Sequence, residues 1–187
     1  LKLELLVAGD PPEPQGPFAD SMALIGSAVF EGAGIKAIGI GGHPDGHPIM
    51  SEAQCWAVID EKVAAITERG MAPLIVTQFA FDADPVLRWL EALRARGIDA
   101  PVRIGVPGPA GIKRLLKFAA HCGVGASASV MKKYGLSITN LLGSAGPDKL
   151  VRQFATDLGP AHGMVRLHFY PFGGIEPTAK WVKSFKA

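Results

Sequence analysis

Short aliphatic runs alternate along the chain with longer segments of helical periodicity. These runs have the length of strands, and one of them, Leu74–Val76, is aliphatic without alternation, which suits a strand buried on both faces of a parallel sheet. There are five of them: Leu3–Val7, Ile35–Ile40, Leu74–Val76, Val102–Val106 and Met164–Phe169. Segments with apolar residues at helical spacing lie between and after them. This order predicts an α/β protein built on a parallel sheet.

The predicted helices carry recognisable start and stop signals. Asp20 or Ser21 can N-cap a helix that runs to about Phe30. Ser51 with Gln54 resembles a capping box that opens a second helix, which ends at Gly70. The pattern predicts further helices over residues 85–96, 115–119, 147–158 and 177–185, with shorter ones around 126–133 and 138–142.

The spacing of the strands is that of a (β/α)8 TIM barrel. A complete barrel has eight strands and usually about 250 residues, whereas this chain has 187 residues and opens at Leu1 inside an apolar run. We therefore expect residues 1–187 to be a single domain that forms the last five strands of a barrel, with their helices, and a preceding segment to supply the first three. An open five-stranded flavodoxin-like sheet also fits the strand count, but it leaves the abrupt start unexplained.

Composition and charge narrow the class of protein. The chain is 48% hydrophobic and 19% charged, with a formal charge of +2, and its basic residues form short helical clusters, so nothing indicates nucleic-acid binding. Cys55 and Cys122 lie far apart, which excludes a zinc ribbon or a disulfide framework and favours a reducing compartment. No apolar run has transmembrane length, and no signal peptide is visible. We expect a cytoplasmic protein that does not bind membranes; the oligomeric state, a homo-oligomer included, stays open.

Polar side chains stand where predicted strands end. Gln78 follows the buried run 74–76, and the second strand leads into a loop with two glycines, two prolines, His43 and His47. Ligands of parallel α/β folds bind at the carboxyl ends of the strands, so these residues are candidates for a small-molecule site. The alternative for Gln78 is a plain cap of a strand end.

A metal site in this loop is disfavoured. His43, Asp45 and His47 are ligand types for a metal. However, Pro44 and Pro48 prevent a helix from presenting both imidazoles on one face, and no third ligand is evident nearby. We therefore expect the histidines to form hydrogen bonds with a ligand and expect no metal.

Three other features do not carry the chemistry that they first suggest. Residues 32–37 match G-x-G-x-x-A, but a helix precedes them and a strand follows, which reverses the order of a dinucleotide-binding turn. Ser127 and Ser129 lack the glycine spacing of a nucleophile elbow, so a serine hydrolase is not supported. His168 lies within a strand and is predicted to be a buried histidine with satisfied hydrogen bonds, not a base.

Five strand ends together resemble one enzyme family. Their segments are VAGD (7–10), GGHPDGHP (41–48), VTQFAFD (76–82), PVRIGVPGP (101–109) and LHFYPFGG (167–174). In this order and spacing they are similar to the methylenetetrahydrofolate reductases, which are flavin-dependent (β/α)8 barrels. The resemblance implies FAD as cofactor, NADH or NADPH as electron donor and ping-pong reduction of 5,10-methylenetetrahydrofolate to 5-methyltetrahydrofolate, within one-carbon metabolism and methionine biosynthesis.

The resemblance also implies residue roles. Asp10 matches an aspartate beside the flavin ring and the pterin, and the resemblance implies that Asp10 is the catalytic residue. The cofactor-binding residues implied are Gly9, Asp10, His43, His47, Lys62 and Tyr170, with Lys62 near the flavin phosphates. Gln78 matches a glutamine that forms hydrogen bonds with the pterin, and Phe118 matches an aromatic residue that stacks on folate or nicotinamide.

The chain departs from the family pattern at several positions. His43 replaces a tyrosine, Gly174 replaces an arginine of some relatives, and Arg114 stands where a glutamine contacts folate, so Arg114 is assigned to substrate binding. The family's catalytic glutamate, on its first strand, has no counterpart here. Two other functions stay open: a non-catalytic folate- or flavin-binding part of a barrel, and a (β/α)-barrel enzyme of other chemistry whose basic clusters hold a phosphate ligand.

Overall fold

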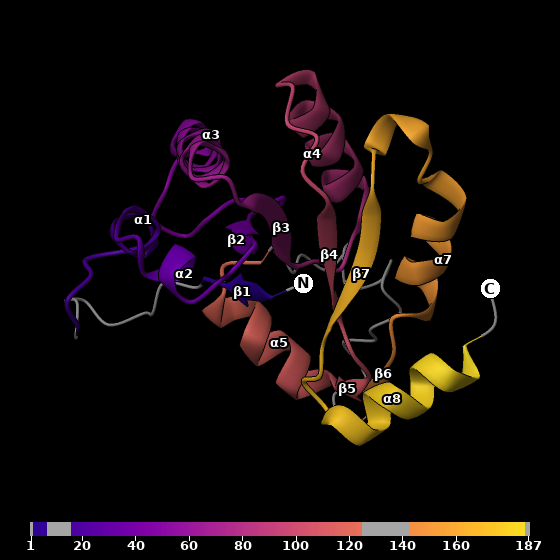
Figure 1. Cartoon of the computed structure of the whole chain (residues 1–187). Helices are drawn as coiled ribbons and strands as arrows, with labels where there is room; N and C mark the ends of the chain where they lie inside the picture. The colour runs from indigo at the N-terminus through magenta and orange to yellow at the C-terminus, as the bar shows by residue number, and fades with distance from the viewer. Residues whose placement is uncertain (1, 7–15, 125–142, 186–187) are drawn as a thin grey trace.

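A curled sheet of five parallel strands organises the molecule. In this computed structural model, which describes residues 2–6, 16–124 and 143–185, the strand order is β1-β2-β3-β4-β7 (Figure 1). The strands are β1 (Leu3–Leu5), β2 (Ala37–Gly42), β3 (Ala72–Phe79), β4 (Val102–Pro107) and β7 (Val165–Tyr170). Every neighbouring pair is parallel. All five predicted strands are therefore confirmed, with ends that shift by a few residues.

The core lies between the middle strands and the helices that follow them. Strands β2, β3 and β4 carry fully buried residues such as Ile38, Ile75 and Ile104, each with 0% exposure. The two edge strands are less covered: all three residues of β1 are exposed, and β7 is mostly half-buried. The three middle strands are thus the covered ones, as expected within a parallel sheet, while the runs that predicted β1 and β7 form less covered edge strands.

Helices cover the outer face of the sheet in an arc (Figure 1). They are α1 (Ser21–Gly26), α2 (Val29–Gly32), α3 (Glu52–Glu68), α4 (Ala83–Ala95), α7 (Asp148–Asp157) and α8 (Ile175–Ser184). The capping box of Ser51 and Gln54 forms as predicted, and Gly70 and Gly97 follow α3 and α4 with φ of +72° and +76°. The predicted first helix is capped by Asp20 but is two short helices, because Ala28 takes a left-handed conformation (φ 62°) that interrupts it.

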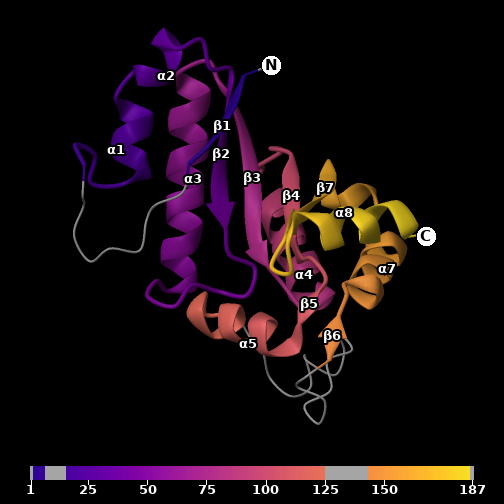
Figure 2. The same ribbon diagram turned by 90° about the horizontal axis from the view of Figure 1, so that it is seen from below.

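The helix α5 (Ile112–His121) lies elsewhere, across the carboxyl ends of β2 and β3 (Figure 2). A small antiparallel pair, β5 (Ala110–Gly111) and β6 (Ser144–Ala145), stands at its beginning. Sequence periodicity did not indicate these strands, which have two residues each. The short helices predicted around 126–133 and 138–142 fall outside the described residues.

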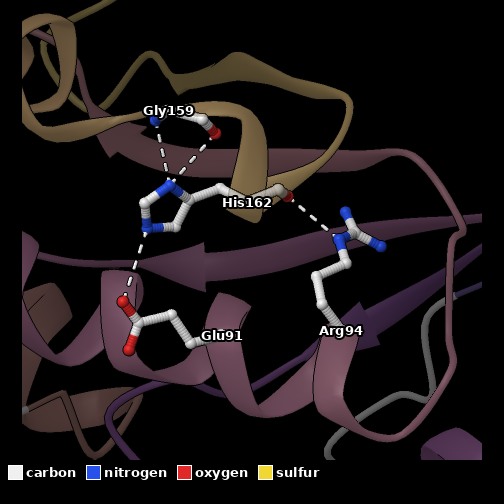
Figure 3. A network of polar contacts seen from close by, with 4 residues as sticks. All are labelled: Glu91, Arg94, Gly159 and His162. Carbon is white, nitrogen blue, oxygen red and sulfur yellow. Dashed lines mark hydrogen bonds and ion pairs between the residues drawn. The ribbon is translucent and has the colours of Figure 1, made fainter.

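A polar network joins the end of α4 to the short 3-10 helix η1 (Pro160–His162) (Figure 3). Arg94 donates hydrogen bonds to the carbonyl oxygens of His162 (2.9 Å), Ile98 (2.5 Å) and Ala100 (2.9 Å). The ring of His162 lies between Gly159, which its Nδ1 contacts, and Glu91, whose carboxylate is 3.9 Å from Nε2. This network fixes the loops at the amino ends of β4 and β7, far from the ligand edge of the sheet.

Within the described ranges, no helix combines the length and the apolar character needed to cross a membrane.

Candidate functional site

A pocket of about 400 Å³ opens at the carboxyl ends of the strands. Side chains or backbone from β1, β2, β3, β7, α1, α3 and the end of α5 contribute to its wall. Its lining consists of Leu5, Leu6, Ser21, Gly41, Gly42, His43, His47, Pro48, Met50, Cys55, Val58, Ile59, Lys62, Val76, Gln78, His121, Cys122 and Tyr170. Five of the residues singled out from the sequence, on four separate segments, therefore share one cavity: His43, His47, Lys62, Gln78 and Tyr170.

Gln78 lines this pocket, and its amide is held by one hydrogen bond. Its Oε1 accepts a hydrogen bond from the backbone N–H of Phe79 at 3.1 Å. Among the described residues, nothing accepts a hydrogen bond from its NH₂ group, which leaves two donors for a ligand. Gln78 can therefore cap the end of its strand and contact a ligand at the same time, because the two interactions use different ends of its amide.

The two histidines of the loop after β2 pack edge to face, with ring centroids 4.8 Å apart. Nδ1 of His47 accepts a hydrogen bond from the backbone N–H of Ile49 (3.3 Å), so a neutral His47 carries its proton on Nε2 and can donate it. Burial, helped by the charges of His47 and Lys62, lowers the pKa of His43 to about 4. His43 is therefore a neutral ring at physiological pH.

One face of α3 forms a wall of the pocket. Cys55, Val58, Ile59 and Lys62 line it, at the spacing that places residues on one side of a helix. Burial lowers the pKa of Lys62, and the carboxylate of Asp20 opposes this shift. Resemblance to the family pointed to Lys62 and not to Cys55 as a site residue, although Cys55 precedes Lys62 by seven residues, two turns along the same face of a helix.

Tyr170 reaches the pocket from the end of β7. Its hydroxyl donates a hydrogen bond to the backbone carbonyl of Thr77 at 3.0 Å, so the side chain spans from one strand to another across β4. Burial, with a smaller contribution from Cys122, raises the pKa of Tyr170. The phenol therefore stays protonated and remains a donor. His168, two residues earlier, is half-buried and packs on the Tyr170 ring at 5.0 Å.

Two predicted substrate residues lie outside the pocket lining. The ring of Phe118, on α5, stacks on Phe172 with centroids 4.3 Å apart and is 37% exposed. Arg114, one turn earlier, donates a hydrogen bond to the carbonyl oxygen of Phe172 at 3.0 Å. Both side chains thus join α5 to the loop after β7. Gly9 and Asp10 fall outside the described residues.

A second, smaller pocket of about 300 Å³ lies behind the histidine loop. His43 and Cys55 line both pockets, and Asp45 is the acidic group of the loop that faces the second one. Burial, reinforced by the charge of Asp82, raises the pKa of Asp45 to about 6, while Arg88 opposes the shift. Among the residues that the structure describes, no group of three or more histidine, cysteine or acidic side chains could hold a metal ion.

Comparison with known proteins places these residues in a family. The family model for methylenetetrahydrofolate reductase matches residues 7–173, which is most of the chain. The chain belongs to the methylenetetrahydrofolate reductase family. The protein "Methylenetetrahydrofolate reductase (NADH) 1" of Arabidopsis thaliana is 27% identical over 185 residues, covering 89% of this chain and 30% of the plant protein. The chain thus spans less than a third of that relative.

Family membership also decides the fold class. Members of this family are (β/α)8 TIM barrels, and the curled five-stranded sheet is part of such a barrel. The prediction of a barrel is confirmed, and the flavodoxin-like alternative is wrong. The pocket lies at the carboxyl ends of the strands, the edge at which enzymes of this fold place their active sites.

Proposed function

We propose that this protein takes part in the flavin-dependent reduction of 5,10-methylenetetrahydrofolate to 5-methyltetrahydrofolate, with NADH or NADPH as electron donor. The observation that carries the proposal is the single pocket shared by His43, His47, Lys62, Gln78 and Tyr170 in a chain of this family. The reductase named for its use of NADH in Arabidopsis supports NADH as the donor to test first.

The residues present fit a flavin with its phosphates. The pocket offers one ammonium group, on Lys62, the three imidazoles of His43, His47 and His121, and an exposed stretch of backbone at Gly41. An ammonium suits an anionic phosphate, and rings with polar tips suit a flat heterocycle that is apolar on its faces and polar at its edge. We assign His43, His47, Lys62 and Tyr170, together with Gly9 and Asp10, to FAD binding.

A bound flavin supplies hydride transfer between the nicotinamide and the folate. The protein's task is to orient the reacting rings within about 3–3.5 Å of each other. Gln78 would hold the pterin through its free NH₂ donors, and Asp10 would stabilise cationic character that develops on the folate. Because one site serves both substrates in turn, we expect ping-pong kinetics.

Two observations on the purified protein test this function. We expect a bound yellow chromophore that bleaches anaerobically on addition of NADH or NADPH and regains its colour on addition of methylenetetrahydrofolate, with methyltetrahydrofolate as the product. A chromophore that neither donor bleaches would favour the non-catalytic alternative. A colourless protein that binds phosphate ligands would favour a barrel enzyme of other chemistry.

Lys62 offers a specific test of the cofactor site. Replacing it by methionine keeps the aliphatic stem and removes the charge, so we expect the dissociation constant for FAD to rise about tenfold or more, the loss typical of a hydrogen bond to a charged group. Lys117→Met, the same change at an exposed position of α5 outside the pocket lining, is the control. Equal FAD affinity in both variants would remove Lys62 from the cofactor site.

A further inference from the structure

Strand β3 contains a bulge where it passes β4. Val76 pairs with Arg103 and Phe79 pairs with Gly105, so three steps along β3 match two steps along β4. Thr77 and Gln78 together therefore oppose the single residue Ile104, which defines a one-residue bulge. Bulges redirect side chains and are frequent beside active sites. Here the second residue of the bulge is Gln78, whose amide lines the pocket.

Thr77, the first residue of the bulge, accepts hydrogen bonds from two other strands, β4 and β7. Its side chain has 0% exposure, and its Oγ1 accepts a hydrogen bond from the backbone N–H of Gly105 at 2.8 Å. Its backbone carbonyl accepts the hydrogen bond from the Tyr170 hydroxyl at 3.0 Å. A β4 amide thus holds the side chain of Thr77, and a β7 phenol holds the peptide that leads into Gln78.

The backbone of the bulge also rests directly on Gly105. A Cβ atom added to Gly105 would lie 2.5 Å from the carbonyl oxygen of Thr77 and 2.7 Å from that of Gln78. These distances are too short for any side chain, so the close approach of β3 requires glycine at this position. The bulge is therefore constrained on its β4 side by packing as well as by hydrogen bonds.

The orientation of the Gln78 amide follows from this backbone. Its Oε1 is bound to the N–H of Phe79, the next residue after the bulge. The phenyl ring of Phe79 is in turn 1% exposed and packs on Tyr170 and Phe172. Whatever fixes the peptides of Thr77 and Phe79 consequently fixes the direction in which the NH₂ group of Gln78 enters the pocket.

We propose that Thr77 and Tyr170 are positioning residues, which set the orientation of the Gln78 amide toward the pterin through the β3 bulge. The inference rests on the proposed function, because that function gives Gln78 its ligand. It adds a second role for Tyr170: its proton is committed to Thr77, so toward the pocket its oxygen can only accept a hydrogen bond. Neither hydroxyl of the pair needs to touch the folate.

A double-mutant cycle with Gln78 tests this inference in the holoenzyme. Thr77→Val removes the hydroxyl at nearly constant shape, and Thr77→Ser restores it. We expect Thr77→Val to weaken folate binding about tenfold by titration calorimetry and to slow the folate half-reaction, while Thr77→Ser stays within about twofold of the wild type. The half-reaction with NADH should keep its rate. In a Gln78→Ala background, Thr77→Val should cause no further loss of folate affinity, since the group that it positions is gone.

The controls separate positioning from general stability. Thr67→Val removes a hydroxyl that bonds to the Val63 carbonyl on the exposed side of α3, and should leave folate binding unchanged. If Thr77→Val does not fold, Tyr170→Phe goes through the same cycle with folate affinity of the FAD-loaded protein as its only readout, because it removes the other hydrogen bond and keeps the ring contacts, while Tyr170 is itself assigned to FAD binding. Losses that add in the double mutant, or that fall equally on both half-reactions, would overturn the inference. Failure of the wild-type enzyme to reduce folate would instead overturn the proposed function.

Discussion

The side chain of Gln78 has two ends with different partners. Oε1 accepts the hydrogen bond from the N–H of Phe79, whereas the NH₂ group has no acceptor among the described residues and stays available to a ligand in the pocket that Gln78 lines. Gln78→Glu keeps the acceptor and removes the donor, so we expect it to spare the fold and FAD binding. A pterin acceptor would lose its partner, which typically costs about 1–3 kcal/mol, or roughly 5- to 150-fold in folate affinity. Folate affinity and melting temperature should be measured on the same preparation.

Gln54→Glu is the matched control for this substitution. Gln54 is the exposed third residue of α3, where glutamate also completes a capping box, so folate affinity and stability should both be retained. A Gln78→Glu protein with a lowered melting temperature and normal folate affinity would show that Gln78 only caps its strand.

The raised pKa of Asp45 predicts that the free energy of unfolding depends on pH. Its pKa is about 6 in the folded protein and about 3.9 in an unfolded chain. A raised pKa means that the folded state holds the proton more tightly than the unfolded chain does, so protonation of Asp45 stabilises the fold. This stabilisation is complete below about pH 4 and is lost as the pH rises through about 6. Asp45→Asn should therefore raise the free energy of unfolding by about 1–2 kcal/mol at pH 7.5, after allowance for partial exposure, and by little at pH 4.

Urea denaturation at both pH values checks this expectation. Glu61→Gln, which neutralises an exposed carboxylate on α3, serves as the control and should change stability by less than about 0.5 kcal/mol at either pH. Equal stabilisation by Asp45→Asn at pH 4 and pH 7.5 would rule out the titration of Asp45 as the cause.

At the scale of elements, Arg94 joins three segments. Its guanidinium donates hydrogen bonds to the carbonyl oxygens of Ile98 and Ala100 in the loop before β4. It also donates one to the carbonyl oxygen of His162 in η1 (Figure 3). Arg94→Met keeps the aliphatic stem but leaves these acceptors without a donor. We expect a loss of about 2–4 kcal/mol in the free energy of unfolding, measured in urea, and an unchanged affinity for FAD.

Arg96→Met separates this effect from the loss of any arginine on α4. Arg96 forms an exposed ion pair with Asp60 (3.2 Å) and lies over the ring of Trp56, so its removal should cost about 1 kcal/mol or less. Similar losses in both variants would show that the three carbonyl contacts of Arg94 contribute little to stability.

At the scale of the whole molecule, the sheet has two edges. Within the described residues, β1 and β7 each pair on one side only, and Leu3 and Leu5 are 40% and 43% exposed. Such edges favour association, so we expect residues 1–187 expressed alone to associate, with weak protection of the β1 amides against hydrogen exchange. Light scattering and exchange measure both. A monomer with a cooperative thermal transition and protected β1 amides would contradict this expectation.

A charged residue on the edge strand refines this test. Leu3→Lys should reduce association of the isolated chain, because a lysine on an edge strand opposes further pairing. Val182→Lys makes a comparable change on α8, at a side chain with 48% exposure, and should have no such effect. If both variants reduce association equally, net charge and not the β1 edge controls it.

The sequence by itself determined the elements and their order. Short aliphatic runs marked all five strands, because most positions of strands in a covered parallel sheet are apolar. Local signals also sufficed for the helix ends at Ser51, Gly70 and Gly97, since caps act through neighbouring peptides. The residues at the strand ends, in their order, were enough to identify the family.

Only the tertiary structure decided how those residues meet. It brings Gln78, Lys62 and the histidine loop to one pocket, and it leaves Phe118 and Arg114 outside the pocket lining, in contact with Phe172. It also revealed the β3 bulge, which periodicity along one strand cannot show, because a bulge is a mismatch in register between two strands. Contacts between strands far apart in the chain, such as that of Tyr170 with Thr77, depend on the sheet order and not on local sequence.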